Sequence, residues 1–386
     1  MRTSRLVLIP AAALAFAAPL AACSSDDTAT DTTTETSETV TEETATEAAE
    51  ADSADDGATP APTDAAPVNV VATTTMLGDV AAQIVTCANP ESTATTLMPI
   101  GADPHDFSPS SAQVAEMVQA NIVIANGLEL EAGLDDALEN AASDGATVIE
   151  IAAMLDPIPF GAGGHSHDDE HSDDDHAHDE AKEDDHGHGD EDHAHDEVKE
   201  DERADEDHDH GSEDPHFWFD MNRMATAAQI IGDELATTGG QAYADCGLQV
   251  ADEIRAAEAE VRAVLESVPA DQRILVTDHD ALGYLADVYG YEVAGTVIPA
   301  GTTLAEPSSA DLAELVKVMQ DEGVRAIFAN TADPTALSDA VAAEVGGDVR
   351  VVNLYVGSLG GPGSGAEDYV SMMRTNADLI AGALTS

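Results

Sequence analysis

Two acidic low-complexity tracts determine which parts of this chain can fold. Residues 24–67 contain no aromatic residue, Leu, Ile, Lys or Arg, and residues 161–214 contain 25 acids, three bases and 11 histidines. Neither tract can bury enough apolar surface to offset the entropy lost when a chain is ordered. A folded body must therefore be built from about residue 68 onwards, and we expect the second tract to be a disordered insert within it.

The charge balance selects partners of positive charge. The chain has 77 Asp and Glu against 13 Lys and Arg, for a formal net charge of −64. Such a chain cannot neutralise a phosphate backbone, so we expect no nucleic-acid partner. Cations are the expected ligands.

The first residues have the features of an export signal. Arg2 and Arg5 precede the apolar run 6–20, which is too short to span a membrane comfortably. The following Leu-Ala-Ala-Cys resembles a bacterial lipobox. We predict a signal peptide over residues 1–22, a lipid on Cys23 that anchors the protein to the outer face of the cell membrane, and an acidic tether that completes residues 23–67. A signal cleaved nearby with an incidental Cys is the alternative, and the protein is exported in both cases.

Acylation of Cys23 leaves Cys87 and Cys246 as the only other thiols. An oxidising compartment favours a disulfide between them. Two buried free thiols are the alternative, because the sequence does not place these positions near one another.

The body alternates short β-rich runs with helical periodicity, which favours parallel-sheet α/β units. A helix is predicted over 311–319 and a longer one over 241–267, where apolar residues recur at helical spacing. At ~1.5 Å per residue the longer helix is roughly 40 Å long. It separates two groups of strands, so we interpret it as a connection between lobes, with a simple amphipathic surface helix as the alternative. The predicted strands are 68–73, 122–125, 147–151, 273–277, 326–329 and 349–355.

The insert contains paired histidines. The sequence HAHDEAKED at His176 recurs as HAHDEVKED at His193, and five H-x-H pairs occur. Residues i and i+2 of an extended chain face the same way, so each pair can present two imidazoles to one zinc, copper or nickel ion. An inert acidic spacer is the alternative. The predicted secondary metal-collecting residues are His165, His167, His171, His176, His178, His186, His188, His193, His195, His208 and His210.

Only three histidines lie outside the insert. His105 is in a turn-rich stretch after a strand-like segment at 95–98, His216 follows the insert, and His279 follows the predicted strand 273–277. Loops at strand ends are where α/β proteins place ligand groups. A lone His is more often a packed or surface residue, but each of these stands near an Asp that can orient a ligating ring. Together they predict a metal site.

The frames GADPHDFSPS, EDPHFWFD and TDHDALGYLADVYG, with PSSADLAELV and the tail LYVGSLGGPGSGAEDYVSMMRTN, resemble the zinc/manganese substrate-binding lipoproteins of ABC importers. The resemblance extends roughly from Asn69 to the C-terminus. It implies an α/β fold of two parallel-sheet lobes, at 68–240 and 269–386, joined by a rigid helix at 241–268, with the ion in the cleft between them. The implied partners are an ABC permease and its ATPase, and we expect the receptor to be a monomer.

The resemblance also implies the ligands. His105 and His216 match the two ligands of the first lobe, and His279 matches the first ligand of the second lobe, where manganese-type relatives usually have Glu. Gly357 departs from the pattern, because many relatives have a carboxylate there. The fourth ligand is then water, a residue of the insert, or a carboxylate. The carboxylates considered are Asp280, Asp333 and Glu306. Three imidazoles with an oxygen suit Zn²⁺, and Mn²⁺, which prefers more oxygen, is the alternative cation.

Three functions fit these patterns. The first is an extracytoplasmic zinc receptor of an ABC importer, which needs no covalent chemistry and is not an enzyme. The second is an exported zinc hydrolase, which also uses three ligands and a water, although the chain has no H-E-x-x-H or similar motif. The third is a surface metal buffer or adhesin in which the insert is the functional part.

Overall fold

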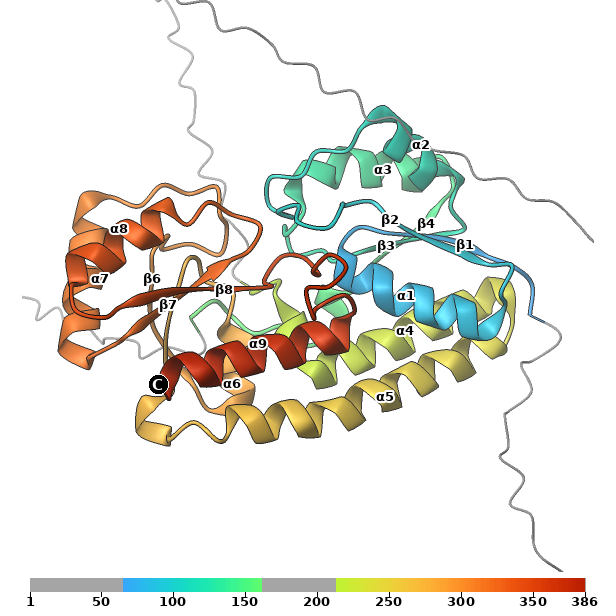
Figure 1. Ribbon diagram of the computed structural model, residues 1–386. Helices are drawn as coiled ribbons and strands as arrows, with labels where there is room; N and C mark the ends of the chain where they lie inside the picture. The colour runs from blue at the N-terminus through green and yellow to red at the C-terminus, as the bar shows by residue number, and fades with distance from the viewer. Residues whose placement is uncertain (1–64, 162–212, 386) are drawn as a thin grey trace, which may run out of the picture. The chain divides into compact units, whose positions relative to one another are not determined.

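The computed structural model describes residues 65–161 and 213–385 (Figure 1). Cys23, the signal peptide and the eleven histidines of the insert lie outside the described residues. Within the described ranges, no helix is long and apolar enough to cross a membrane.

The first sheet is parallel, with the strand order β2-β1-β3-β4. Its side chains alternate between two cores: Val70 and Ala72 of β1 contribute to the largest apolar cluster, whereas Val71 between them contributes to a second cluster on the opposite face. This period of two is expected of a strand buried on both faces. The strands are β1 (Asn69–Ala72), β2 (Thr93–Thr96), β3 (Ile122–Ala125) and β4 (Thr147–Glu150).

The second sheet repeats this topology, with the order β6-β5-β7-β8. In β7, Phe328 belongs to the largest cluster and Ile327 to a third cluster on the other face. The two parallel sheets confirm the predicted α/β class. The strands are β5 (Ile274–Thr277), β6 (Glu292–Thr296), β7 (Ala326–Asn330) and β8 (Arg350–Leu354).

The sequence does not predict β6, and it places β2 two residues late. β6 is an edge strand that is half-buried at all five positions and contains Gly295. β2 is an edge strand of the first sheet, and its sequence Thr-Ala-Thr-Thr carries no large apolar residue. Edge strands bury little, so their hydrophobic pattern is weak.

Helices cover the faces of both sheets (Figure 1). The helix predicted over 311–319 lies within α7, which Ser308 caps by accepting a hydrogen bond from the amide of Asp311, whose carboxylate accepts from the Ser308 amide. The helices are α1 (Thr75–Ala88), α2 (Ser111–Gln119), α3 (Asp135–Ser143), α4 (Met221–Gly239), α5 (Ala242–Leu265), α6 (Gly283–Tyr289), α7 (Ser309–Glu322), α8 (Ala336–Val345) and α9 (Tyr369–Leu384).

The long helix α5 contacts elements of both halves of the chain. It packs against α1, α4 and α9. A disulfide joins Cys87 of α1 to Cys246 near the start of α5, with the two Cα atoms 5.9 Å apart. At its far end the carbonyl of Leu265 accepts a hydrogen bond from the hydroxyl of Tyr291. With 24 residues, α5 is about 36 Å long.

The folded part extends slightly into both predicted tracts. The amide of Ala66 donates to the carbonyl of Gly239, and the hydroxyl of Tyr243 donates to the carbonyl of Ala66. Glu213 forms an isolated antiparallel bridge with Pro159, and Asp214 is only 1% exposed. The residues that immediately precede His216 are therefore part of the fold.

Candidate metal centre

His105 is presented by the loop that follows β2. Its backbone amide donates to Asp103 Oδ1 at 3.1 Å, and the histidine is 7% exposed. The other carboxylate oxygen of Asp103 accepts from the hydroxyl of Thr303, which belongs to the second half of the chain. Asp103 therefore ties the His105 loop to the loop after β6.

His216 stands immediately before the 3₁₀ helix η3 (Phe217–Phe219). Asp214 Oδ1 accepts from its backbone amide at 2.9 Å and lies 2.7 Å from its ring Nδ1. The indole of Trp218 donates to the carbonyl of Val356, which fixes η3 against the loop after β8. With Nδ1 bound to a carboxylate, Nε2 is the ring atom of His216 left for another partner.

His279 follows β5 and has the same kind of partner. Asp278 Oδ1 accepts from the His279 amide at 2.8 Å and lies 2.9 Å from its Nδ1, while Asp278 Oδ2 accepts from the amide of Asn330 at the end of β7. Because β5 and β7 are neighbours in the sheet, Asp278 is held between two strand ends. His279 is 1% exposed.

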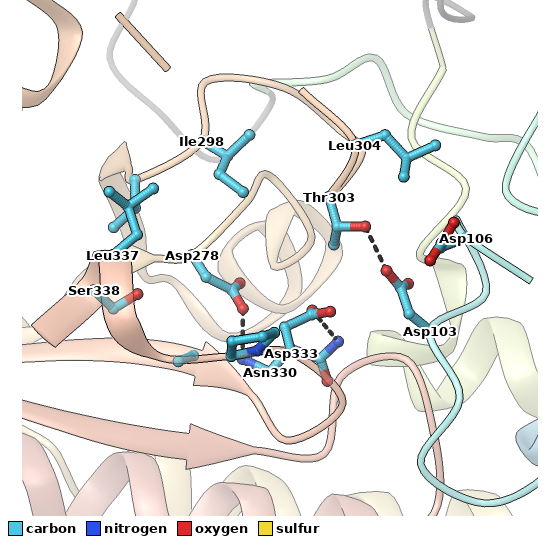
Figure 2. Close-up of a pocket in the computed structure, with 13 residues that line it drawn as sticks. Asp103, Asp106, Asp278, Ile298, Thr303, Leu304, Asn330, Asp333, Leu337 and Ser338 are labelled. Carbon is cyan, nitrogen blue, oxygen red and sulfur yellow. Dashed lines mark hydrogen bonds between the residues drawn. The ribbon is translucent and has the colours of Figure 1, made fainter. Parts of the chain in front are cut away.

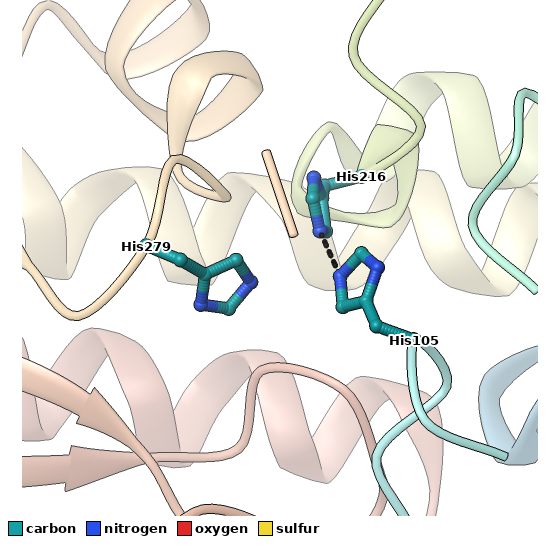
Figure 3. A group of neighbouring side chains, drawn as sticks. All are labelled: His105, His216 and His279. Carbon is teal, nitrogen blue, oxygen red and sulfur yellow. Dashed lines mark hydrogen bonds between the residues drawn. The ribbon is translucent and has the colours of Figure 1, made fainter. Parts of the chain in front are cut away.

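The three rings converge on one point (Figure 3). Their centroids lie 5.4 to 5.5 Å apart, and one nitrogen of each lies within 4.8 Å of the nitrogens of the other two. The Nε2 atoms of His105 and His216 are 3.3 Å apart. Two nitrogens bound at ~2.05 Å to a tetrahedral zinc are separated by about 3.3 Å, so this pair already has the spacing of two zinc ligands.

Known proteins share the sequence pattern of this chain. The sequence profile of the family described as "Zinc-uptake complex component A periplasmic" matches residues 70–383. The chain belongs to this family. Manganese-binding lipoprotein MntA of Halalkalibacterium halodurans is 23% identical over 83% of this chain and 90% of its own length. Zinc-binding protein TroA of Treponema pallidum is 33% identical over 44% of this chain and 57% of its own length. The family indicated by the sequence motifs is thereby confirmed.

Solved structures of similar proteins have the same fold. The periplasmic zinc-binding protein TroA of Treponema pallidum covers 83% of this chain and all of its own, with a TM-score of 0.64 and 23% identity. A manganese-bound periplasmic metal-binding protein of Candidatus Liberibacter asiaticus covers 82% of this chain and 99% of its own, with a TM-score of 0.61 and 20% identity. The α/β fold that the resemblance implies is thus found in both.

Gly357, the position at which the sequence resemblance implies a carboxylate, lies against the His105 loop. A Cβ atom added to Gly357 would stand 2.7 Å from Pro104 Cδ, so the proline ring occupies the space that a side chain would need. The three carboxylates considered as a fourth ligand, Asp280, Asp333 and Glu306, are not part of the histidine cluster. Among the described residues the cluster therefore offers three nitrogens and no carboxylate.

Burial and two aspartates set the protonation of the cluster. Burial lowers the pKa of His216 well below its ordinary value, and burial raises the pKa of Asp214 to about 7. Burial also opposes charge on His279, but the hydrogen bond and negative charge of Asp278 outweigh it and raise the pKa of His279. The same interaction lowers the pKa of Asp278 against the effect of its burial. His216 thus offers a neutral imidazole, and Asp278 supplies a negative charge behind His279.

An acidic cavity of about 230 Å³ adjoins His279 through Asp278 (Figure 2). Its walls come from both halves of the chain and include four carboxylates: Asp103, Asp106, Asp278 and Asp333. Burial, followed by the charge of Asp103, raises the pKa of Asp333 to about 6. The cavity gives the cluster a negatively charged neighbourhood.

The structure brings together all three histidines outside the insert, whereas the insert histidines and Cys23 lie outside the described residues. The sequence predicts an orienting Asp near each histidine, which Asp214 and Asp278 confirm, but it assigns Asp214 to the insert and misses Asn330. Asp214 falls inside the predicted insert, although the shared Asp-Pro-His frame of His105 and His216 signals it. The aspartates of the two Asp-Pro-His motifs differ in role. Asp214 lies against the ring of His216, whereas Asp103 accepts a hydrogen bond from the hydroxyl of Thr303. Asn330, which holds Asp278, has no sequence signal of its own.

Proposed function

We propose that this chain is the extracytoplasmic zinc receptor of an ABC importer, which captures Zn²⁺ through three histidines and delivers it to the permease. The convergence of His105, His216 and His279 in a buried cluster carries the proposal. His105 and His279 follow strands, and His216 precedes a 3₁₀ helix. Three buried imidazoles that face one another are best explained by the binding of a shared ligand. The carboxylates beside Nδ1 of His216 and His279 leave Nε2 of each ring as the atom that can bind a cation.

The donor set favours zinc over manganese. Relatives of this chain include proteins named for zinc and for manganese, so family membership leaves both cations open. Three neutral imidazoles with one water suit tetrahedral Zn²⁺, whereas Mn²⁺ prefers an octahedral set rich in oxygen. Gly357 and Pro104 leave no room for a carboxylate at the position where one would add oxygen. Mn²⁺ is the alternative cargo.

The cation would join two parts of the chain. His105 and His216 flank the first sheet, and His279 extends from the second sheet. An ion bound by all three histidines stabilises the conformation that brings them together. This change in conformation can signal to a permease that the receptor holds metal. At a free zinc concentration a thousandfold above the dissociation constant, binding would stabilise the fold by about 4 kcal/mol.

The N-terminal sequence features determine where in the cell the receptor is located. A signal peptide exports it, and a lipid on Cys23 holds it at the outer face of the membrane beside the permease, whose ATPase drives transport from inside. The insert histidines collect metal weakly and are secondary to the tight site.

Calorimetry with a competing chelator tests this function. Wild-type protein should bind one zinc tightly, and His279→Ala should lose more than the roughly 100-fold in affinity that removal of an outer hydrogen-bond partner can cost. His193→Ala, in the insert, is the matched control and should keep the tight site. Unchanged tight binding by His279→Ala would refute the assignment.

A hydrolase is the other function compatible with three histidines and a water. Zinc-loaded protein should show no hydrolysis of ester, peptide or lactam substrates above a zinc-free sample. Turnover that depends on zinc and disappears in His279→Ala would replace the receptor function with the enzymatic one.

A further inference from the structure

The turn that follows β3 has an unusual backbone. Gly127, Leu128 and Glu129 are three consecutive residues with φ values of 84°, 54° and 60°. This left-handed region is unfavourable for residues that carry a Cβ, and runs of it are rare. Such a conformation persists only where the surrounding structure imposes it, and it is often found at functional sites.

A buried carboxylate holds the turn. Glu131 is 2% exposed, and its Oε1 accepts hydrogen bonds from the hydroxyl of Thr73 at 2.6 Å and the amide of Asn126 at 2.7 Å. Its Oε2 accepts from the amide of Gly127 at 3.1 Å. Three donors, two of them from the turn itself, thus point at one carboxylate. A buried acid is costly unless it is satisfied in this way, so its presence here calls for a reason beyond packing.

One end of this turn contacts the backbone immediately before His216. Asn126 is fully buried, and its Nδ2 donates to the carbonyl of Pro215 at 3.0 Å. Pro215 directly precedes His216. The position of the turn therefore sets the position of the peptide that carries the second histidine.

The other end contacts the His105 loop. Gly133 lies in the 3₁₀ helix η1 (Ala132–Leu134), and a Cβ atom added to it would stand 2.4 Å from the carbonyl oxygen of Phe107. Phe107 is two residues after His105. No other residue type fits at position 133 without displacing this loop.

We infer that residues 126–133, held in shape by Glu131, are a positioning element that sets the distance between His105 and His216. This β3 turn contacts the backbone beside each of these histidines, and their rings are the pair whose Nε2 atoms are already 3.3 Å apart. The inference rests on the proposed function, because the spacing matters only if both rings bind one cation.

Gly133→Ala tests the contact with the His105 loop. Alanine suits the local helix, while its Cβ would displace the backbone at Phe107. Zinc affinity should fall about 10-fold to 100-fold, as for other residues that orient ligands from outside, and the visible spectrum of the Co²⁺-substituted protein should change. Gly382→Ala, in α9 where an added Cβ meets no atom within 4 Å, is the matched control and should alter neither.

Glu131→Gln tests the carboxylate. The glutamine amide would place a donor against the amide of Gly127 or leave one donor of the turn unpaired. We expect a fall in zinc affinity of similar size and a changed Co²⁺ spectrum. Tyr243→Phe removes a buried hydroxyl that bonds Ala66 and Ser92 at the opposite edge of the same sheet. It controls for lost stability and should lower the melting temperature without changing the spectrum.

The outcomes separate this inference from the proposed function. If wild type binds one zinc, His279→Ala loses it, and both Gly133→Ala and Glu131→Gln keep the wild-type affinity and Co²⁺ spectrum, the positioning role is overturned and the receptor function stands. If wild type binds no zinc tightly, the proposed function falls and the inference falls with it. Should Glu131→Gln not fold, Gly133→Ala with its control decides the question alone.

Discussion

Asp278→Asn is the substitution that best isolates the role of a carboxylate behind a ligand. Asparagine has the same shape, so its Oδ1 can still accept from His279 Nδ1, as the carboxylate does at 2.9 Å. The other carboxylate oxygen becomes an NH₂ group that faces the amide of Asn330, where a donor now meets a donor. The strand-end contact between β5 and β7 is thereby broken, and the negative charge behind His279 is removed.

The expected loss of zinc affinity is about 10-fold to 100-fold, the usual effect of removing an outer partner of a metal-bound histidine. That range corresponds to about 1.4 to 2.8 kcal/mol of binding free energy. Competition against a chromophoric zinc chelator at pH 8 measures it, since at that pH few protons compete for the imidazoles.

Asp106→Asn is the control for charge. Asp106 lines the same acidic cavity but is exposed, so its charge contributes at most about 1 kcal/mol, or roughly fivefold in affinity. A loss in Asp278→Asn no larger than that in Asp106→Asn would show that Asp278 acts only as one charge among several, and would refute its role in orienting His279.

Three further predictions concern the whole site and its surroundings. Zinc affinity should fall as the pH is lowered from 7.5 to 5.5, because protons compete for the imidazoles, and His279, whose pKa is raised, takes up its proton at higher pH than an ordinary histidine. Calorimetry that finds constant affinity across this range would contradict a three-histidine site. The double variant Cys87→Ser/Cys246→Ser opens a loop with a sequence separation of 159 and should lower the free energy of unfolding by about 2 to 5 kcal/mol in urea titrations, yet leave zinc affinity intact; a loss of affinity would mean that α1 and α5 shape the site. Deletion of residues 162–212 should remove weak metal binding but keep the tight site, whereas deletion of 161–214 should also weaken the tight site because it removes Asp214, the partner of His216; equal tight affinity in the two deletions would argue against that partnership.

The sequence predicts the buried strands and the edge strands β4 and β8, but it misses the edge strand β6 and displaces β2. Strands such as 122–125 are apolar at every position and are found where predicted, because burial on both faces leaves a clear signal. β6 is half-buried throughout and carries no such signal. An edge strand is recognised by its hydrogen bonds to a neighbour, which the sequence does not display.

The three histidines can be selected from sequence, but their meeting point cannot. His105 and His216 are separated by 111 residues, and His279 follows β5 of the second sheet. Ligand groups gather at the carboxyl ends of parallel strands, which accounts for the positions of His105 and His279 but not for that of His216, which precedes η3. Acidic neighbours make Asp214 look like part of the insert, whereas its burial and the bridge between Pro159 and Glu213 show that folded structure has resumed there.

X-ray absorption spectroscopy of the zinc-loaded protein tests the central claim most directly. Three imidazole nitrogens at about 2.0 Å and one further light ligand are predicted, and His105→Ala, His216→Ala and His279→Ala should each remove one imidazole from the shell. A zinc shell with fewer than three imidazoles in the wild type, or one that none of the three substitutions changes, would contradict the account.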